Sequence, residues 1–190
     1  MTEGRNKKPP ENPMPPIATI AASAGGLAAT KKLLQHMPPD CGIALVVIHH
    51  LAPDHESMIP ELLQAVTEME VAEVGTAVKP EPNHVYTIPP NKYLEVKDGF
   101  IAPVEPTAQR GHRMAVDHFL RSLAKESGTK AMCMILSGTG TDGSLGLKEI
   151  NEAGGLVLAQ NPEQAEFKGM PTSAISTQMV DRVLNAEQMP

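Results

Sequence analysis

Three polar side chains of this chain could together activate a nucleophile. Ser23, His50 and Asp142 each lie just after an apolar stretch, at the point where a buried strand would end. A serine hydroxyl attacks poorly at neutral pH unless a base removes its proton. An imidazole does this best when a carboxylate holds its tautomer and stabilises its cation. If the fold brings the three side chains together, the sequence predicts acyl-transfer chemistry.

The residues around Ser23 favour a sharp turn. The segment 21–25, Ala-Ala-Ser-Ala-Gly, resembles a nucleophile elbow, G-x-S-x-G, with Ala21 in place of the first Gly. Small neighbours let the chain turn tightly, and a helix after the turn would aim backbone N–H groups at a developing oxyanion. The alternative is an ordinary glycine-rich turn in which Ser23 caps the next helix.

The histidine and the aspartate also have structural alternatives. His49 precedes His50, and successive residues of a strand point to opposite faces, so at most one of the two can face Ser23. The other interpretation of this pair is a strand end with one solvated histidine. Asp142 could instead be the N-cap of a helix that begins at Gly143 or Ser144. The residues alone leave these alternatives open.

The turn that contains Asp142 also matches a nucleotide-binding pattern. Gly138, Gly140 and Gly143 satisfy G-x-G-x-x-G, and Glu163 lies at a suitable distance for a ribose hydroxyl. However, Asp142 would face the phosphates, and fewer than 50 residues follow Gly143, too few for the usual βαβαβ half. A nucleotide-binding domain is therefore the less favoured hypothesis.

Apolar runs and helical stripes alternate along most of the chain. This alternation predicts an α/β fold, with a doubly wound, mainly parallel sheet flanked by helices in three layers and a site at the carboxyl ends of the strands. Prolines interrupt the middle of the sequence, and we expect a β-hairpin insertion around residues 84–104 that turns at Asp98-Gly99. Strands are predicted at 17–21, 43–48, 71–74, 131–136, 156–160 and 179–184, and helices at 27–37, 55–67, 116–128, 143–153 and around Pro171.

Length and composition narrow the class of protein. The chain has 190 residues, 41% hydrophobic and 20% charged, which suits one globular domain. Residues 1–16 contain five prolines and no periodicity, so we expect a flexible leader before a folded domain at 17–190. The net charge of -6 argues against nucleic acid, and without a long apolar run or signal peptide we expect a cytoplasmic protein with no membrane insertion. Cys41 and Cys133 lack metal-binding spacing, so we expect reduced structural thiols and no metal or cofactor.

Four motifs, taken in order, carry a resemblance to one family: Ala22 to Gly26, Val47 to Leu51, Leu136 to Gly143, and Lys168 to Pro171 followed by Ala174-Ile175. They resemble the catalytic domain of the chemotaxis protein-glutamate methylesterase, the CheB type. The match runs from about Ile17 to the last residue. It is specific because four separated motifs agree in sequence order.

The resemblance implies hydrolysis of glutamyl γ-methyl esters on chemoreceptor helices, often with glutamine deamidation, in chemotaxis or related two-component signalling. It implies Ser23 as nucleophile, His50 as base and Asp142 as orienting acid. The implied oxyanion donors are the backbone N–H groups of Ala24 and Thr139. Two departures are visible: His49 stands where the family usually has Gln, and Ala21 replaces the first Gly of the elbow.

The family's soluble regulators also carry an N-terminal receiver domain, which the leader is too short to form. The chain therefore resembles the bare esterase domain that also occurs at the front of proteins fused to a receptor methyltransferase. The implied partners are methylated chemoreceptor helices and a fused or separate methyltransferase. A catalytically idle docking module with the same fold is the alternative that the sequence leaves open, as is a fragment of a longer fusion.

Overall fold

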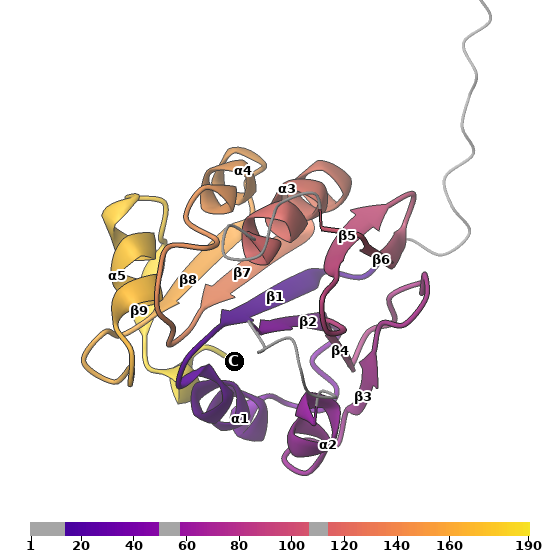
Figure 1. Ribbon diagram of the computed structural model, residues 1–190, viewed down its shortest axis with the longest axis horizontal. Coiled ribbons are helices and arrows are strands. Elements are labelled where there is room, and N and C mark those ends of the chain that lie inside the picture. The colour runs from indigo at the N-terminus through magenta and orange to yellow at the C-terminus, as the bar shows by residue number, and fades with distance from the viewer. Residues whose placement is uncertain (1–13, 50–57, 107–113) are drawn as a thin grey trace, which may run out of the picture.

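A seven-stranded parallel sheet forms the centre of the computed structural model, which describes residues 14–49, 58–106 and 114–190 (Figure 1). The strand order is β3-β4-β2-β1-β7-β8-β9, and every neighbouring pair is parallel. The predicted parallel α/β sheet is thereby confirmed. Its strands are β1 (Ile17–Ala22), β2 (Ala44–His49), β3 (Glu70–Glu73), β4 (His84–Thr87), β7 (Ala131–Ile135), β8 (Leu156–Gln160) and β9 (Arg182–Leu184).

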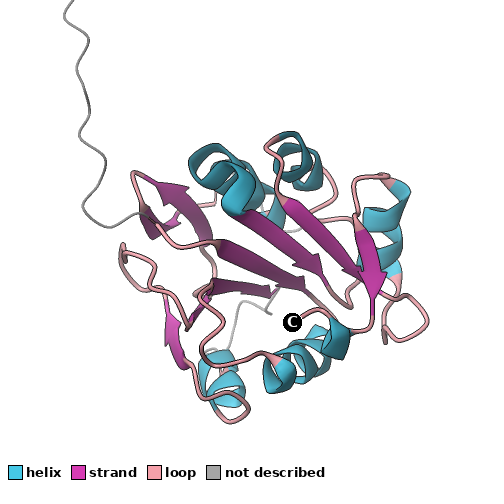
Figure 2. Cartoon of the chain, turned by 180° about the vertical axis from the view of Figure 1, so that it is seen from behind, coloured by secondary structure: helices cyan, strands magenta, loops and turns pink. Residues whose placement is uncertain are grey.

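Helices cover both faces of this sheet, which gives the three layers expected (Figures 1 and 2). One face, here called the α1 face, packs against α1 (Gly26–His36), α2 (Ile59–Gln64) and the short 3-10 helix η2 (Ala186–Gln188). The other, the α3 face, packs against α3 (Ala115–Ser127), α4 (Gly146–Glu152), α5 (Gly169–Ser176) and the hairpin of β5 (Tyr93–Lys97) and β6 (Phe100–Val104). A second 3-10 turn, η1 (Gly128–Lys130), links α3 to β7. Among the described helices, none has the length and apolar character to cross a membrane.

The predicted hairpin insertion begins later than expected. The hairpin is confirmed over Tyr93–Val104, where β5 and β6 pair antiparallel. The expectation that it begins at residue 84 is wrong, because His84–Thr87 is a strand of the main sheet between β2 and β3. Buried side chains on both of its faces, Val85 and Tyr86, show why this short segment is held there. The nearby prolines lie outside the strand, near its two ends.

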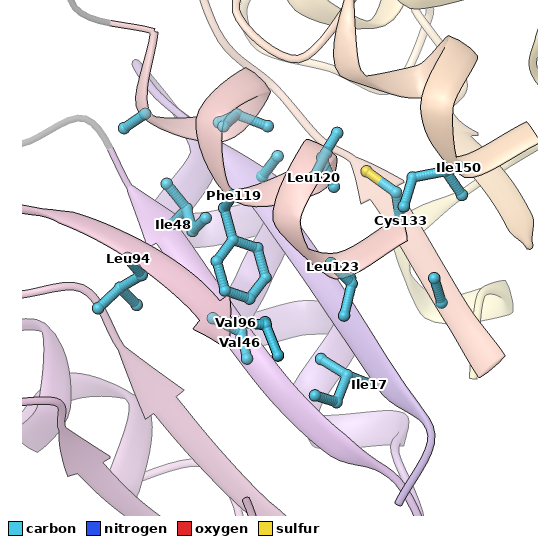
Figure 3. Close-up of a cluster of buried hydrophobic side chains, with 14 of the residues drawn as sticks. Ile17, Val46, Ile48, Leu94, Val96, Phe119, Leu120, Leu123, Cys133 and Ile150 are labelled. Atoms are coloured by element: carbon cyan, nitrogen blue, oxygen red, sulfur yellow. The ribbon is translucent and has the colours of Figure 1, made fainter. Parts of the chain in front are cut away.

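The largest buried cluster lies on the α3 face (Figure 3). Apolar residues recur along α3 at helical spacing, and Phe119, Leu120 and Leu123 are all fully buried. In Figure 3 they pack over Ile17 of β1 and Val46 of β2, beside the hairpin. Each such side chain stabilises the fold by about 1.5–3 kcal/mol relative to exposure. This packing fixes the position of α3, whose first turn contacts the candidate site.

Strands β1 and β7 are neighbours whose following helices lie on opposite faces of the sheet. The chain leaves β1 toward α1 on one face and leaves β7 toward α4 on the other. In open α/β sheets such a switch point opens a crevice at the carboxyl ends of the strands, where ligands bind. The turns that contain Ser23 and Asp142 are the two that diverge at this point.

Candidate active site

The turn after β1 presents Ser23 beside the turn after β7. Pairing between the two strands continues past their ends: the Leu136 N–H donates to the Ala21 carbonyl at 2.8 Å, and the Ser23 N–H donates to the Ser137 carbonyl at 3.0 Å. The Gly26 N–H then donates to the Ser23 carbonyl at 2.9 Å and closes the turn. Ser23 is half-buried at this bend. The sharp turn predicted from its small neighbours is therefore present.

Glycines let α1 approach the site closely. Gly25 has φ +67°, in the left-handed region that favours glycine, and it occupies the N-cap of α1 with no side-chain capping bond. The alternative role of Ser23 as the cap of that helix is thus not what the structure shows. A Cβ at Gly26 would come within 2.5 Å of the Ala22 Cβ and 2.8 Å of the Ser137 carbonyl oxygen. No larger residue fits there without moving backbone.

Asp142 is buried and points at the first turn of α3. Its Oδ2 accepts a hydrogen bond from the Val116 N–H and its Oδ1 accepts one from the Asp117 N–H, both at 3.0 Å. The residue is 6% exposed. Free N–H groups of a first helical turn suit a carboxylate acceptor, and two such bonds fix its orientation. The alternative in which Asp142 is the N-cap of the following helix is not what the structure shows, since that helix, α4, begins only at Gly146.

A second carboxylate, Asp117, lies behind Asp142 and was missed by sequence reasoning. Its Oδ1 accepts the Gly146 N–H at 2.7 Å, so Asp117 caps α4 just as Asp142 caps α3. It is 2% exposed. Burial raises the pKa of the Asp117 carboxyl; the Gly146 N–H opposes this, the charge of Asp142 adds to it, and Arg121 opposes it. The only local signal was an acid in the first turn of a helix, which is ordinarily exposed.

The faces of the sheet separate His49 from Ser23. His49 pairs in register with Ala22, whose side chain belongs to the α1 face, and the His49 Nε2 would lie 3.3 Å from a Cβ at Gly26. The Ser23 Cβ lies toward the other side: a Cβ at Gly138 would be 3.0 Å from it and 2.2 Å from the Sδ of Met170, a residue of the α3 face. His49 is thereby directed away from Ser23. His50 lies outside the described residues.

The glycine-rich turn is attached to the start of α5. The Gly138 N–H donates to the Phe167 carbonyl at 3.0 Å, and the Met170 N–H donates to the Gly138 carbonyl at 2.9 Å. Thr139 is exposed. Among the described residues, no hydrogen-bond acceptor is found for the backbone N–H of either Ala24 or Thr139. Their role as oxyanion donors stays a prediction.

The same turn does not suit a nucleotide. Gly140 and Gly143 have φ +89° and +98°, so the glycines serve backbone conformations that other residues avoid. However, the Gly146 N–H at the start of α4, where a pyrophosphate would sit, already binds the Asp117 carboxylate. Glu163 is exposed and pairs with Lys168 at 2.7 Å. The turn therefore presents a carboxylate rather than a phosphate cradle.

The buried cysteine beside the site is a structural residue. Cys133 of β7 is 0% exposed, and burial raises the pKa of its thiol, with the charges of Asp117 and Asp142 adding to the effect. A thiol with a raised pKa is a poor nucleophile. Within the described ranges, no group of three or more His, Cys, Asp or Glu residues is placed to hold a metal ion.

A serine turn and a buried carboxylate on neighbouring strands, at the switch point of a parallel sheet, are the arrangement of a hydrolytic α/β domain. The CheB methylesterase family model matches residues 18–190, and the chain belongs to this family. The crystal structure of the CheB methylesterase catalytic domain of Thermotoga maritima superposes with a TM-score of 0.85 at 26% identity, covering 92% of this chain and 94% of that one.

Curated relatives carry matching names. The protein-glutamate methylesterase/protein-glutamine glutaminase of Pectobacterium atrosepticum is 34% identical over 178 residues, covering 91% of this chain and 50% of the relative. The protein of the same name from Photorhabdus laumondii is 32% identical over 177 residues, with the same coverage. A protein-glutamate methylesterase/protein-glutamine glutaminase 2 of Pseudomonas aeruginosa is 31% identical over 190 residues, covering 95% and 54%. The chain thus spans about half the length of the curated relatives it matches.

Proposed function

We propose that this chain hydrolyses glutamyl γ-methyl esters on methylated chemoreceptor helices, and deamidates glutaminyl side chains there, using Ser23, His50 and Asp142. Family membership and the names of the relatives support the reaction class. The observation that carries the proposal is the bond of 3.0 Å between the Ser23 N–H and the Ser137 carbonyl. It joins the turn of the nucleophile to the turn that ends in Asp142.

The choice of His50 as the base rests on the direction of His49 and on the family resemblance. His49 points toward the α1 face, whereas Ser23 and Asp142 are directed to the α3 face. Since His49 is directed away from Ser23, we assign the base to His50, the histidine that the resemblance to the CheB family implies. The register that aligns Ala22 with His49 also makes β2 the neighbour of β1 at this edge.

The proposed reaction gives each of the three residues a role. The Ser23 hydroxyl attacks the ester carbonyl carbon while the His50 imidazole takes its proton, and the charge on the oxyanion is met by the Ala24 and Thr139 N–H groups. The bond to methoxide then breaks, the imidazolium returns the proton, and methanol leaves. Water, activated by the same imidazole, hydrolyses the acyl-serine to the free glutamate. Asp142, held by its two helix N–H bonds, orients the imidazole and stabilises its cation.

A methanol-release assay on a synthetic peptide that contains glutamate γ-methyl ester tests the proposal. We expect Ser23→Ala to lower kcat by on the order of 10⁴-fold or more with the fold intact. Ser176→Ala is the matched control, because Ser176 is exposed on α5 and its hydroxyl donates to the Thr172 carbonyl of its own helix at 2.8 Å. A Ser23→Ala protein that turns over at the wild-type rate would reject the assignment.

Two paired experiments address the remaining alternatives. His50→Gln should abolish hydrolysis while His49→Gln retains it; the reverse result would make His49 the base. An activated phosphonate should label Ser23 in the wild type, whereas a catalytically idle docking module would not react. The proposal also implies a cytoplasmic setting and a methyltransferase, fused or separate, that supplies the methylated substrate.

A further inference from the structure

Ser137 is a buried serine that contacts both turns of the site. It is 1% exposed and lies at the point where β7 ends. Its Oγ donates to the Ala24 carbonyl at 3.0 Å and accepts the Phe167 N–H, also at 3.0 Å. Its own carbonyl accepts the Ser23 N–H. One residue therefore joins the turn of the nucleophile, the glycine-rich turn and the loop that leads into α5.

The contacts of Ser137 connect the two segments that carry the proposed oxyanion donors. The Ser137 hydroxyl holds the Ala24 carbonyl, and therefore the conformation of the residue that follows Ser23. The Phe167 segment, which the hydroxyl also holds, accepts the Gly138 N–H at 3.0 Å, directly before Thr139. The Ser137 hydroxyl thus contacts the segment that carries the Ala24 N–H and, through Phe167, the segment that carries the Thr139 N–H. Misplacement by about 1 Å in such a constellation can cost 10²-fold in rate.

A network of hydrogen bonds that runs from the buried end of β8 to the protein surface holds Ser137 in turn. The Ser137 N–H donates to Gln160 Oε1 at 2.8 Å, and Gln160, 3% exposed, donates from Nε2 to Gln164 Oε1 at 3.0 Å. Gln164 then donates to Glu187 Oε2 at 2.7 Å, and Glu187 pairs with Lys32 of α1 at 3.0 Å. The buried link between Ser137 and Gln160 is the firm part of this network, because the Lys32–Glu187 pair at its outer end is exposed to solvent. This hydrogen-bond network therefore connects Ser137 to α1, the helix that follows the nucleophile.

We propose that Ser137 is a positioning residue for ester hydrolysis, whose hydroxyl sets the placement of the oxyanion donors on the turns that it joins. The inference rests on the proposed function, because positioning matters only if Ser23 is the nucleophile. A residue of this kind affects kcat rather than KM, since it acts on a group needed in the transition state. A merely structural serine would change stability alone.

Ser122 supplies the matched control. Its Oγ donates to the Phe119 carbonyl at 2.8 Å and accepts the Val96 N–H at 3.0 Å, so Ser122→Ala removes two bonds of the same kind as Ser137→Ala. It tethers α3 to the hairpin and takes no part in either turn of the site. We expect both variants to lose comparable thermal stability. Only Ser137→Ala should lower kcat on the methyl-ester peptide, by about 10- to 100-fold, with KM within about twofold of the wild type.

Variants at Ser137 that retain or weaken the hydroxyl donor provide a second test of the inference. Ser137→Thr retains the hydroxyl and should restore most of kcat, and Ser137→Cys, a weaker donor, should fall between Thr and Ala; this order can be read from the variants that fold. Equal kcat for Ser137→Ala and Ser122→Ala at a temperature where both are folded would overturn the inference. An inactive wild type that does not take up phosphonate at Ser23 would instead reject the proposed function.

Discussion

Substituting Gly138 by alanine should damage both the stability and the proposed chemistry. The new Cβ would lie 2.2 Å from the Sδ of Met170 and 3.0 Å from the Cβ of Ser23, whereas ordinary contacts begin at about 3.4 Å. Met170 is 2% exposed and its N–H is bonded to the Gly138 carbonyl, so its backbone cannot retreat without losing that bond. The strain must be shared between the Met170 side chain and the nucleophile turn.

The expected magnitude follows from these overlaps. Extra methyl groups in a packed interior cost about 1–3 kcal/mol, and a flexible methionine keeps the cost within this range. For a domain of this size each kcal/mol lowers Tm by roughly 2–4 °C, so we expect a decrease of about 2–12 °C. A shift of Ser23 by a few tenths of an ångström should lower kcat on the methyl-ester peptide by about 10- to 100-fold.

Thermal unfolding and initial-rate kinetics, measured on the wild type and four variants (Gly138→Ala, Gly42→Ala, Met170→Ala and Met170→Ala with Gly138→Ala), separate the two contacts. Gly42→Ala is the control, since Gly42 has φ +76° and nothing within 4 Å of its Cβ position, so it should lose stability through backbone strain with kcat unchanged. In a Met170→Ala background, Gly138→Ala should destabilise by at least about 1 kcal/mol less than it does alone. The low kcat should persist there, because the contact with Ser23 remains. A Gly138→Ala protein with wild-type Tm and kcat would refute the steric argument, as would an unchanged cost without Met170.

Two further predictions concern the buried carboxylates. Asp142→Asn places an amide NH₂ against one of the two α3 N–H donors. Denaturant titration should therefore show that the free energy of unfolding falls by about 1–3 kcal/mol, and kcat should fall as well. Unchanged stability would contradict the capping role. Burial raises the pKa of Asp117 above 3.8, so the folded state holds its proton longer and loses stability as the pH rises through that raised pKa. The Tm of Asp117→Asn relative to the wild type should therefore rise between about pH 3 and pH 7; a constant difference would argue against the burial effect.

Elements with strong local periodicity were predicted well, and those whose partners lie far along the chain were not. Strands β1, β2, β7 and β8 are buried on both faces and read as continuous apolar runs. Strand β4 is equally buried but was assigned to the hairpin. An extended segment flanked by prolines carries no local mark of its partner, and only assembly of the sheet places it between β2 and β3.

The features of the site also divide into those that could be predicted from local sequence and those that depend on distant partners. Residue types and small neighbours in the sequence predicted a tight turn at Ser23 and a carboxylate in the turn after β7. The capping of α3 by Asp142 could not be predicted, because its donors lie about 25 residues earlier and meet it only when α3 packs on the sheet. Asp117 and Ser137 were missed for the same reason: an acid in a first helical turn and a serine after a strand are common in sequences, and only folding buries these two and gives them partners far along the chain.

The sequence by itself determined which groups are available for chemistry and that they follow the strands of a parallel sheet, since these depend on residue type and on periodicity along the chain. The tertiary structure alone decided how the groups face one another. It joined the Ser23 turn to Ser137, turned Asp142 toward α3 and directed His49 to the α1 face. The physical reason is that side-chain direction in a sheet depends on register and parity, and capping depends on which helix end packing brings within hydrogen-bond distance.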